Sequence, residues 1–335
     1  MKAIIPLAGV GTKLRPHTYT QPKALIPIAG KTILSVIIDQ LLDEGINEFI
    51  FIIGYLGDKI QDYIVRTYPH LNCQFIFQNV RKGTGHAIWL TQKIVKNDEM
   101  LIVFGDTIAD YDIKRLINSP YSEIGVRRID DPREFGVAEI DSQDNILKLV
   151  EKPKIPKSNM ALVGIFKVKD SELLFKTLDE YVAGQDEIID GEYHLTVAMQ
   201  RMIENGYCYK AFKVNNWFDC GKKDSLIKTN AILLKSDATD VESLKSLYPN
   251  SVFIPPVSIG KDCVLDNAII GPNVSIGEAT SIKQSIISNS IISAYAELEE
   301  VVLTSSIIGS DAFVRGMSQS LNIGDNTNID FGIQP

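Results

Sequence analysis

Short apolar runs alternate with helix-like segments over the first two thirds of the chain. The runs at 2–7, 49–53, 73–77 and 101–104 have the continuous apolar character of buried parallel strands. Apolar positions three and four residues apart predict helices at 32–44, 58–68, 83–95, 171–181, 194–205 and 224–234. This alternation is typical of βαβ units and predicts an α/β domain, a Rossmann-like three-layer α/β/α arrangement with helices on both faces of the sheet. Ligands of such sheets bind at the carboxyl ends of the strands.

Four further strand patterns, at 124–128, 136–140, 146–150 and 162–168, have little helix between them. They predict an antiparallel or mixed extension of the sheet, since parallel strands need longer crossover connections. The polar stretch 236–250 then reads as a linker, which assigns residues 1–235 to the first domain.

After residue 250 the hydrophobic period changes. An aliphatic residue recurs every five or six positions, at Ile259, Leu265, Ile270, Ile276, Ile282, Ile287, Ile292, Leu298, Leu303, Ile308 and Val314. Such hexapeptide-like repetition predicts a parallel β-helix in which each short strand contributes one inward aliphatic side chain. A β-sandwich would instead alternate with period 2. We therefore assign residues 251–335 to a short β-helix of about four coils.

Charge is distributed unevenly along the chain. The 34 Lys and Arg against 42 Asp and Glu give a net charge of −8, which disfavours a protein that wraps nucleic acid. Residues 251–335 hold nine acids and three bases, whereas residues 1–38 contain five bases and no acid. A basic, glycine-containing opening in an acidic protein predicts an anion site.

The sequence predicts a soluble protein of the cytoplasm with no membrane partner. No apolar run reaches the ~20 residues that span a bilayer, and the first run is too short for a signal peptide. The cysteines are scattered without metal-ligand or disulfide spacing, at Cys73, Cys208, Cys220 and Cys263.

The opening loop carries Gly9 and Gly11 directly after the first strand. Glycines let a backbone approach a phosphate closely and let its amides cradle it. The loop is not a dinucleotide-binding fingerprint, because Leu14 stands where the third glycine belongs. The Gly-Lys-Thr at 30–32 is not a Walker A motif either, because Leu25 replaces the upstream glycine.

Further motifs follow this loop in a set order: Pro22-Lys23, Gln78 with Gly83-Thr84-Gly85-His86-Ala87, Gly105-Asp106, Phe135-Gly136-Val137, Glu151-Lys152-Pro153, Val163-Gly164 and Trp217-Phe218-Asp219-Cys220-Gly221. Together they resemble the signature of the sugar-1-phosphate nucleotidyltransferases (NDP-sugar pyrophosphorylases), which reads G-x-G-T-R-L-x-P followed by a Pro-Lys pair. Among the subfamilies the chain is most similar to the long glucose-1-phosphate thymidylyltransferases. That resemblance implies a nucleotidyltransferase domain followed by a left-handed β-helix.

The resemblance implies that an NTP and a sugar 1-phosphate form an NDP-sugar and pyrophosphate, by Mg²⁺-dependent in-line attack on the α-phosphate. The lead substrates are dTTP and glucose 1-phosphate. UTP with glucose 1-phosphate and GTP with mannose 1-phosphate are the alternatives. A non-catalytic regulatory subunit that binds sugar nucleotides is the alternative of another class.

The resemblance also assigns roles to individual positions. Contacts to the reacting phosphates are implied for Lys13, Arg15, Lys23 and Lys152. Nucleotide binding is implied for Leu7, Ala8, Gly9, Gly11, Thr12, Gln78, Gly83 and Thr84. Sugar binding is implied for Gly136, Glu151, Val163 and Gly164. Magnesium binding is implied for Asp106 and Asp219. Lys13 replaces the family's Arg, which retains the charge and loses the bidentate fork.

The positions of the histidines bear on the function of the predicted β-helix. β-Helices of this kind can be acyltransferases, which typically rely on a histidine base. His17, His70, His86 and His194 all precede residue 250, so a structural or oligomerising tail is favoured and a homo-oligomer is expected. His86 lies where a helix starts, in a position typical of capping or packing.

Overall fold

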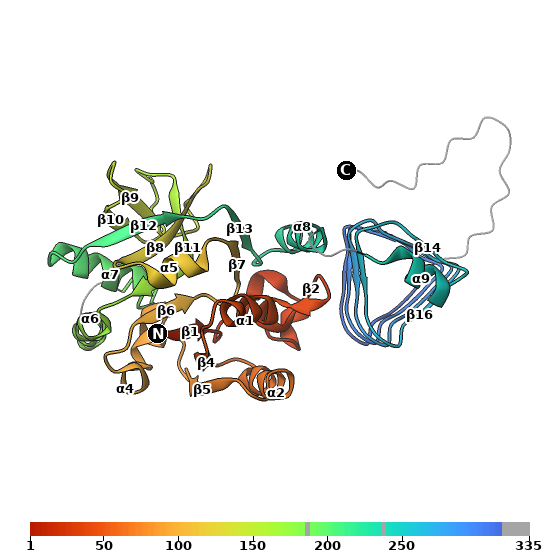
Figure 1. The fold of residues 1–335 in the computed structure, drawn as a ribbon, viewed down its shortest axis with the longest axis horizontal. Helices are drawn as coiled ribbons and strands as arrows, with labels where there is room; N and C mark the ends of the chain where they lie inside the picture. Colours follow the sequence, from red (N-terminus) through yellow and green to blue (C-terminus); the bar gives the residue numbers. More distant parts are fainter. Residues whose placement is uncertain (185–187, 236–238, 317–335) are drawn as a thin grey trace. The chain divides into compact units, whose positions relative to one another are not determined.

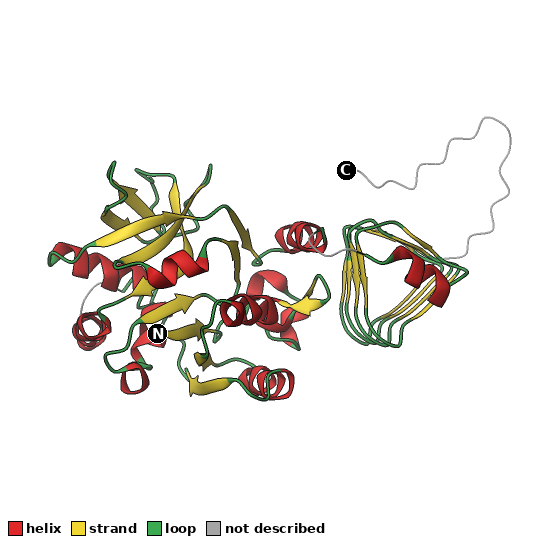
Figure 2. Ribbon diagram, viewed as in Figure 1, coloured by secondary structure: helices red, strands yellow, loops and turns green. Residues whose placement is uncertain are grey.

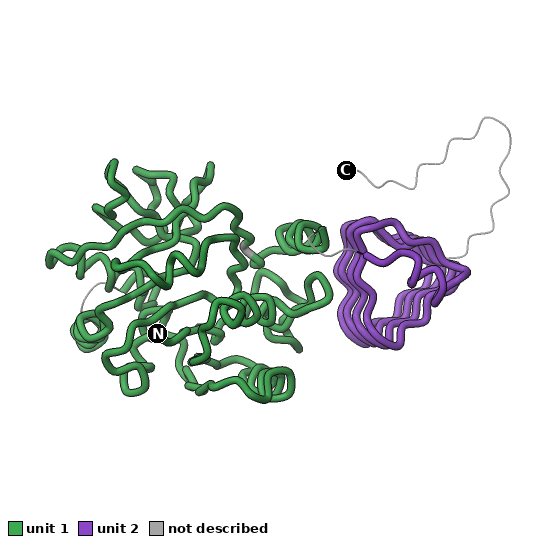
Figure 3. The backbone as a smooth tube through the Cα atoms, in the orientation of Figure 1, with its two compact units in different colours: residues 1–238 green, residues 239–335 purple. Residues whose placement is uncertain are grey.

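The computed structural model describes residues 1–184, 188–235 and 239–316. The chain divides into two compact units, residues 1–238 and residues 239–335 (Figure 3). Residues 236–238 of the predicted linker and residues 317–335 of the predicted β-helix domain lie outside the described residues.

The first unit is built on a mixed β-sheet (Figures 1 and 2). Its parallel part has the order β6-β1-β4-β5 and consists of β1 (Lys2–Pro6), β4 (Glu48–Ile53), β5 (Asn72–Phe77) and β6 (Met100–Val103). The antiparallel extension joins β6 through β11 and consists of β8 (Ser122–Arg128), β9 (Val137–Ile140), β10 (Ile146–Val150) and β11 (Met160–Val168). Strand β12 (Tyr209–Lys213) completes it, parallel to β8. The predicted α/β class and mixed sheet are confirmed.

Helices connect and flank these strands. The α-helices are α1 (Ile33–Asp43), α2 (Gly57–Thr67), α3 (Thr84–Trp89), α4 (Gln92–Val95), α5 (Ile113–Asn118), α6 (Ser171–Ala183), α7 (Leu195–Glu204) and α8 (Lys223–Leu234). Three 3₁₀ turns follow β1, namely η1 (Thr12–Leu14), η2 (His17–Tyr19) and η3 (Lys23–Leu25). Two small ribbons pair β2 (Pro27–Ile28) with β3 (Lys31–Thr32), and β7 (Thr107–Asp110) with β13 (Asn216–Asp219).

The single helix predicted over 83–95 is two helices in the structure. The hydroxyl of Thr91, between α3 and α4, donates to the carbonyl of Ile88 at 2.7 Å. A threonine that bonds to its own backbone in this way competes with the helical ladder, which explains the break. The predicted helix at 32–44 begins as expected, because the Thr32 side chain caps α1 by accepting from the amide of Ser35.

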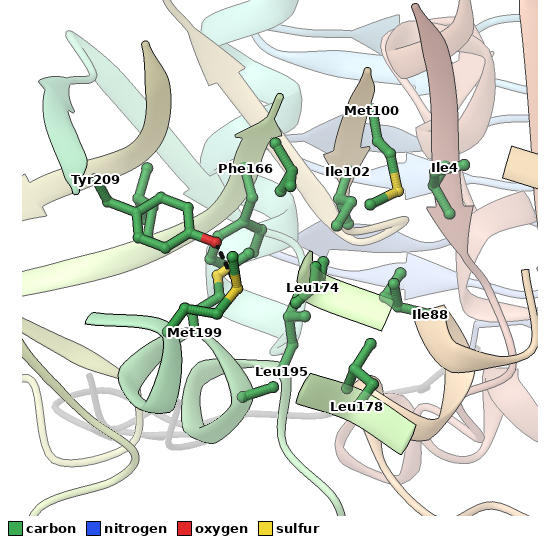
Figure 4. Close-up of a cluster of buried hydrophobic side chains, with 14 of the residues drawn as sticks. Ile4, Ile88, Met100, Ile102, Phe166, Leu174, Leu178, Leu195, Met199 and Tyr209 are labelled. Carbon is green, nitrogen blue, oxygen red and sulfur yellow. Dashed lines mark hydrogen bonds between the residues drawn. The ribbon is translucent and has the colours of Figure 1, made fainter. Parts of the chain in front are cut away.

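A large hydrophobic cluster joins the sheet to α3, α6 and α7 (Figure 4). Ile4 and Ile102 contribute from neighbouring strands, and Leu178 and Met199 contribute from the helices, all fully buried. Tyr209 of β12 enters the same cluster, and its hydroxyl donates to the sulfur of Met202 at 3.1 Å. This core holds the strands in register and so fixes the loops at their ends.

The second unit is a left-handed parallel β-helix with three sheets of four strands each in its described part. The first sheet stacks β14 (Val252–Phe253), β17 (Ile269–Ile270), β20 (Ile286–Ser288) and β23 (Val302–Thr304). The second stacks β15 (Val257–Ile259), β18 (Val274–Ile276), β21 (Ile291–Ile292) and β24 (Ile307–Ile308). The third stacks β16 (Val264–Asp266), β19 (Ser281–Lys283), β22 (Glu297–Glu299) and β25 (Phe313–Arg315).

The recurring aliphatic positions form the interior of the β-helix. They stack in three columns, which are Ile259-Ile276-Ile292-Ile308, Leu265-Ile282-Leu298-Val314 and Ile270-Ile287-Leu303. All belong to one hydrophobic cluster or pack against it, so the prediction of one inward aliphatic per strand is confirmed.

The stretch 236–250, predicted as a linker, contains helix α9 (Val241–Leu247). Asp240 caps this helix by accepting from the amide of Ser243 at 3.1 Å. Leu244 and Tyr248 pack against the core of the β-helix. The stretch holds four large apolar residues, Val241, Leu244, Leu247 and Tyr248, at helical spacing, but its otherwise polar composition favoured a linker over a helix. Across both units, the part of the chain that the structure describes contains no helix long and apolar enough to cross a membrane.

We expect Ile282→Ala to destabilise the β-helix by about 2–5 kcal/mol, because this fully buried side chain fills one of the interior columns. The neighbouring Lys283→Ala, at an exposed position of the same strand, should change stability by less than about 0.5 kcal/mol. Urea unfolding of both full-length variants, followed by circular dichroism, checks this. Equal midpoints for the two variants would contradict the assigned interior.

Candidate active site

A cavity of about 820 Å³ opens at the carboxyl ends of the parallel strands. Its lining comes from the loops after β1, β5 and β6, together with the start of α3: Pro6, Leu7, Ala8, Gly9, Val10, Gly11, Thr12, Lys23, Ala24, Gln78, Asn79, Val80, Arg81, Gly83, Thr84, Ala87, Phe104, Gly105, Asp106 and Glu192. All eight positions with an implied nucleotide-binding role are among them. The cavity therefore lies at the sheet edge where ligands of α/β proteins bind.

The glycine loop, residues 7–15, forms one wall of the cavity. Gly11 has a left-handed backbone with φ 67°. A Cβ there would lie 3.0 Å from the Thr18 methyl and 3.1 Å from Lys23 Cβ. The Thr18 hydroxyl also donates to the Gly11 carbonyl at 2.8 Å. Glycine is required at this position both for its φ and for the space.

Two further glycines let this loop lie against the sheet. A Cβ at Gly105 would lie 2.1 Å from Leu7 Cδ2 and 3.0 Å from the Pro6 carbonyl oxygen. A Cβ at Gly54 would lie 2.9 Å from Ala8 Cβ. The loops after β4 and β6 therefore lie close against Leu7 and Ala8 of the loop after β1, and Lys23 and Asp106 line the same cavity.

An ion pair lies at the cavity wall. Lys23 Nζ is 2.6 Å from Asp106 Oδ2, with side-chain exposures of 16% and 42%. The backbone of β13 runs antiparallel to β7, and Asp219 stands opposite Thr107, next to Asp106. The Cys220 amide also donates to the Asp106 carbonyl at 3.2 Å. The two aspartate positions are thus adjacent in backbone, while the side chain of Asp219 lies outside the described part of the structure.

Two residues with an implied sugar-binding role, Glu151 and Gly136, lie side by side. The side chain of Glu151 is 10% exposed, and Oε1 lies 3.6 Å from His194 Nδ1. A Cβ at Gly136 would lie 3.1 Å from Glu151 Oε2, so this glycine leaves room for the carboxylate. The Val163 side chain is buried in the sheet at 1% exposure, next to Gly125. Any contact of Val163 with a ligand must therefore use its backbone.

Three cations with implied phosphate contacts do not line this cavity. Arg15 lies over the ring of Tyr19, with 4.9 Å from its Cζ to the ring centroid. Lys152 has an exposed side chain and a positive φ of 39°. Lys13 pairs with Glu134 at 2.8 Å.

Glu134 bridges two lysines, which the sequence did not reveal. Its carboxylate accepts from Lys13 at 2.8 Å and from Lys222 at 3.2 Å. These two hydrogen bonds hold the pKa of Glu134 below its usual range. The bridge ties the glycine loop to the loops that carry the Phe135-Gly136 and Asp219 motifs. No spacing rule could have found it, because the partners are far apart in sequence.

Comparison with known proteins identifies the family. Residues 2–236 match the family model described as "Nucleotidyl transferase". The chain belongs to this nucleotidyltransferase family. The match covers the entire first unit apart from its terminal residues, and it confirms the family that the motifs resemble.

Curated relatives of the chain include one that is named as a glucose-1-phosphate thymidylyltransferase. The chain is 35% identical over 243 residues to "Bifunctional protein GlmU" of Methanocaldococcus jannaschii, covering 72% of this chain and 56% of that protein. It is 26% identical over 332 residues to "Glucose-1-phosphate thymidylyltransferase" of Streptomyces griseus, covering 92% of each. The chain thus spans little more than half the length of the first relative.

A solved structure from Bacillus anthracis, titled as a putative glucose-1-phosphate thymidylyltransferase in complex with a sucrose, aligns with a TM-score of 0.61 and 28% identity. The alignment covers 69% of this chain and 94% of that chain. This share corresponds to the size of the first unit of the nucleotidyltransferase.

The donor set at Asp106 fits Mg²⁺. Lys23 occupies Oδ2, and Oδ1 has no hydrogen-bond partner among the described residues. Mg²⁺ in nucleotide enzymes is typically held by one or two carboxylates plus substrate phosphates. Within the described ranges no three His, Cys, Asp or Glu residues gather as a metal site.

We expect Gly11→Ala to weaken nucleotide binding at least tenfold, because a Cβ at this φ displaces the loop and Lys23. Gly206→Ala is the matched control, with φ 89° and open space around the added Cβ. Both variants should lose about 1–2 kcal/mol of stability from the left-handed backbone. Isothermal titration with UTP and dTTP separates them, and equal affinities for the two variants would refute a loop that shapes the site.

Proposed function

We propose that the protein joins a nucleoside triphosphate to a sugar 1-phosphate, releasing pyrophosphate and an NDP-sugar. The observation that carries the proposal is the ion pair of Lys23 and Asp106, 2.6 Å apart on the wall of an approximately 820 Å³ cavity bounded by the glycine loop. A cation beside a carboxylate can neutralise phosphate charge and support a metal at the same point.

The reaction needs positioning and charge neutralisation more than acid–base chemistry. A phosphate oxygen of the sugar 1-phosphate attacks the α-phosphorus, a new P–O bond forms, and the bond from the α-phosphorus to the bridging oxygen breaks as pyrophosphate leaves. The attacking oxygen is already ionised, so no general base is required. The amides of the glycine loop would hold the triphosphate, and Lys23 would stabilise the charge that develops between the two phosphates.

Asp106 and Asp219 would hold Mg²⁺, which when bound neutralises charge on the α-phosphate and on the departing pyrophosphate. Asp106 also keeps the Lys23 ammonium turned toward the cavity. Lys13 and Lys222, held together by Glu134, would contribute positive charge beside the glycine loop. Arg15 would add to it if its side chain leaves Tyr19.

The sugar side of the site is proposed around Glu151, whose carboxylate would accept from sugar hydroxyls. Gly136, Val163 and Gly164 would offer backbone groups beside it, and Lys152 would bind the sugar phosphate. Because Glu151 is buried at 10% exposure beside His194, its orientation is restricted before a sugar arrives.

The proposed lead substrates are dTTP and glucose 1-phosphate, with residues 1–235 as the catalytic domain. The named activity of the Streptomyces griseus relative supports this pair, since that relation extends over 92% of each chain. Release of pyrophosphate from purified protein with a panel of NTPs and sugar 1-phosphates tests the function. No release with any pair would refute it.

We expect Lys23→Met and Asp106→Asn each to lower kcat by on the order of 100-fold or more, since each removes charge at the reacting phosphates. Another Lys–Asp ion pair, between Lys31 and Asp39, has the same 2.6 Å distance between nitrogen and oxygen. Neither residue lines the cavity. Lys31→Met therefore serves as the matched control and should retain activity. Steady-state pyrophosphate assays on all three variants decide the assignment, which fails if Lys23→Met turns over like Lys31→Met.

We also propose a homo-oligomer formed through the first sheet of the β-helix. Val252, Ile269, Ile286 and Val302 stand in register on successive coils and are 56%, 38%, 44% and 78% exposed. A flat ladder of exposed aliphatics is self-complementary, so a second copy can bury the same surface.

The double variant Ile286→Glu/Val302→Glu should shift the protein to a smaller particle, because it places buried charges in the proposed interface. Val264→Glu, at a 52% exposed aliphatic of the third sheet, is the matched control and should leave the particle mass unchanged. Light scattering coupled to gel filtration measures the mass. A monomeric wild-type protein would contradict the proposal.

A further inference from the structure

The side-chain amide of Gln78 is held at the cavity from two sides. Gln78 directly follows β5, lines the cavity and is 5% exposed. Its Nε2 donates to the Gly83 carbonyl at 3.1 Å and lies 3.0 Å from His86 Nδ1. The whole arrangement is local, because Gly83 and His86 belong to the turn and first helical residues that follow Gln78.

The chemistry of these partners decides which way the amide points. A carbonyl oxygen only accepts, so the nitrogen of the Gln78 amide must face Gly83. Burial, with a smaller contribution from the charge of Lys82, lowers the pKa of His86. The neutral ring can then accept at Nδ1 while its hydrogen sits on Nε2. Both amide hydrogens are thereby used, and Oε1 remains as the group of Gln78 that can meet a ligand.

We propose that His86 is a positioning residue that fixes the Gln78 amide with Oε1 toward the bound base, so that the site selects nucleoside triphosphates whose base presents a ring N–H. This inference rests on the proposed function. Uracil, thymine and guanine carry such a hydrogen, on N3, N3 and N1. Cytosine and adenine present a ring nitrogen with a lone pair, which would face the lone pairs of Oε1.

His86 matters because glutamine alone does not discriminate. A free side-chain amide can flip, which exchanges the positions of its oxygen and nitrogen. It can then donate from its NH₂ group to the ring nitrogen of cytosine or adenine. Turning it here would break the bond to Gly83, and His86 would have to move its ring hydrogen from Nε2 to Nδ1 to meet Oε1. A buried polar group left without its partner costs enough to change affinity by roughly tenfold or more.

The test measures kcat/KM for UTP, dTTP, GTP, CTP and ATP at saturating sugar 1-phosphate. The wild-type protein should favour the best of UTP, dTTP and GTP over CTP and ATP by at least tenfold. His86→Phe keeps an aromatic ring beside Trp89, 5.7 Å away between ring centroids, and removes the acceptor. The His86→Phe variant should lower that preference at least tenfold. The change should come from the KM values of the nucleotides, while the KM of the sugar 1-phosphate stays unchanged.

Two further variants separate positioning from packing. His86→Asn places its amide oxygen where Nδ1 lies and should restore the preference. His70→Phe changes an exposed histidine outside the cavity and should match wild type. If His86→Phe unfolds in a thermal melt, His86→Leu replaces it in the same comparison.

The inference is overturned if His86→Phe, or the His86→Leu that replaces it, retains the wild-type preference. It is also overturned if His86→Asn loses the preference. A wild-type protein that uses CTP or ATP as readily as the other nucleotides would overturn it as well. The proposed function fails in a different way, with no pyrophosphate from any pair. In that event titration calorimetry with the same five nucleotides still tests base selection. A wild-type preference that is lost in His86→Phe and restored in His86→Asn would support the inference, and any other pattern would refute it.

Discussion

The close approach of the glycine loop to the ends of the parallel strands is the constraint on which the site depends. Gly54 and Gly105 leave room for Ala8 and Leu7 of the loop that follows β1, because a Cβ at either glycine would collide with them. Gly11 then turns the chain with a left-handed backbone against Thr18 and Lys23. A side chain at any of these positions would push the loop outward, and Lys23 and Asp106 would no longer meet across the cavity.

Charge in this protein is organised around that loop. The net charge of −8 belongs mostly to residues 251–335, whereas the charged residues among the first 38 are all basic. The basic residues of this opening are met by acids from distant segments, Lys13 by Glu134 and Lys23 by Asp106. These pairs are partly or fully exposed and add little to stability. In the proposed function these pairs would hold positive charge beside the glycine loop before the triphosphate binds.

The two units use the hydrophobic effect in different ways. The first unit buries one large cluster between sheet and helices, and that cluster sets the positions of the loops at one edge. The β-helix buries columns of stacked aliphatic side chains, and each coil adds one side chain to a column. Loops of the first unit can therefore carry chemistry, while the second unit presents repetitive faces, one of which carries the exposed aliphatic ladder of Val252, Ile269, Ile286 and Val302.

The sequence by itself determined the fold class, the strands of the parallel sheet, the eleven interior positions of the β-helix and the family, because each rests on a local period or a contiguous motif. It did not reveal helix α9 or the ribbon of β7 and β13, whose short, mixed sequences acquire structure only from what they pack against. Only the tertiary structure decided which motif residues share a cavity, that Glu134 joins two lysines, and that the carbonyl of Gly83 and the ring of His86 orient Gln78. Such facts depend on distances and hydrogen-bond directions, which no spacing in a sequence encodes.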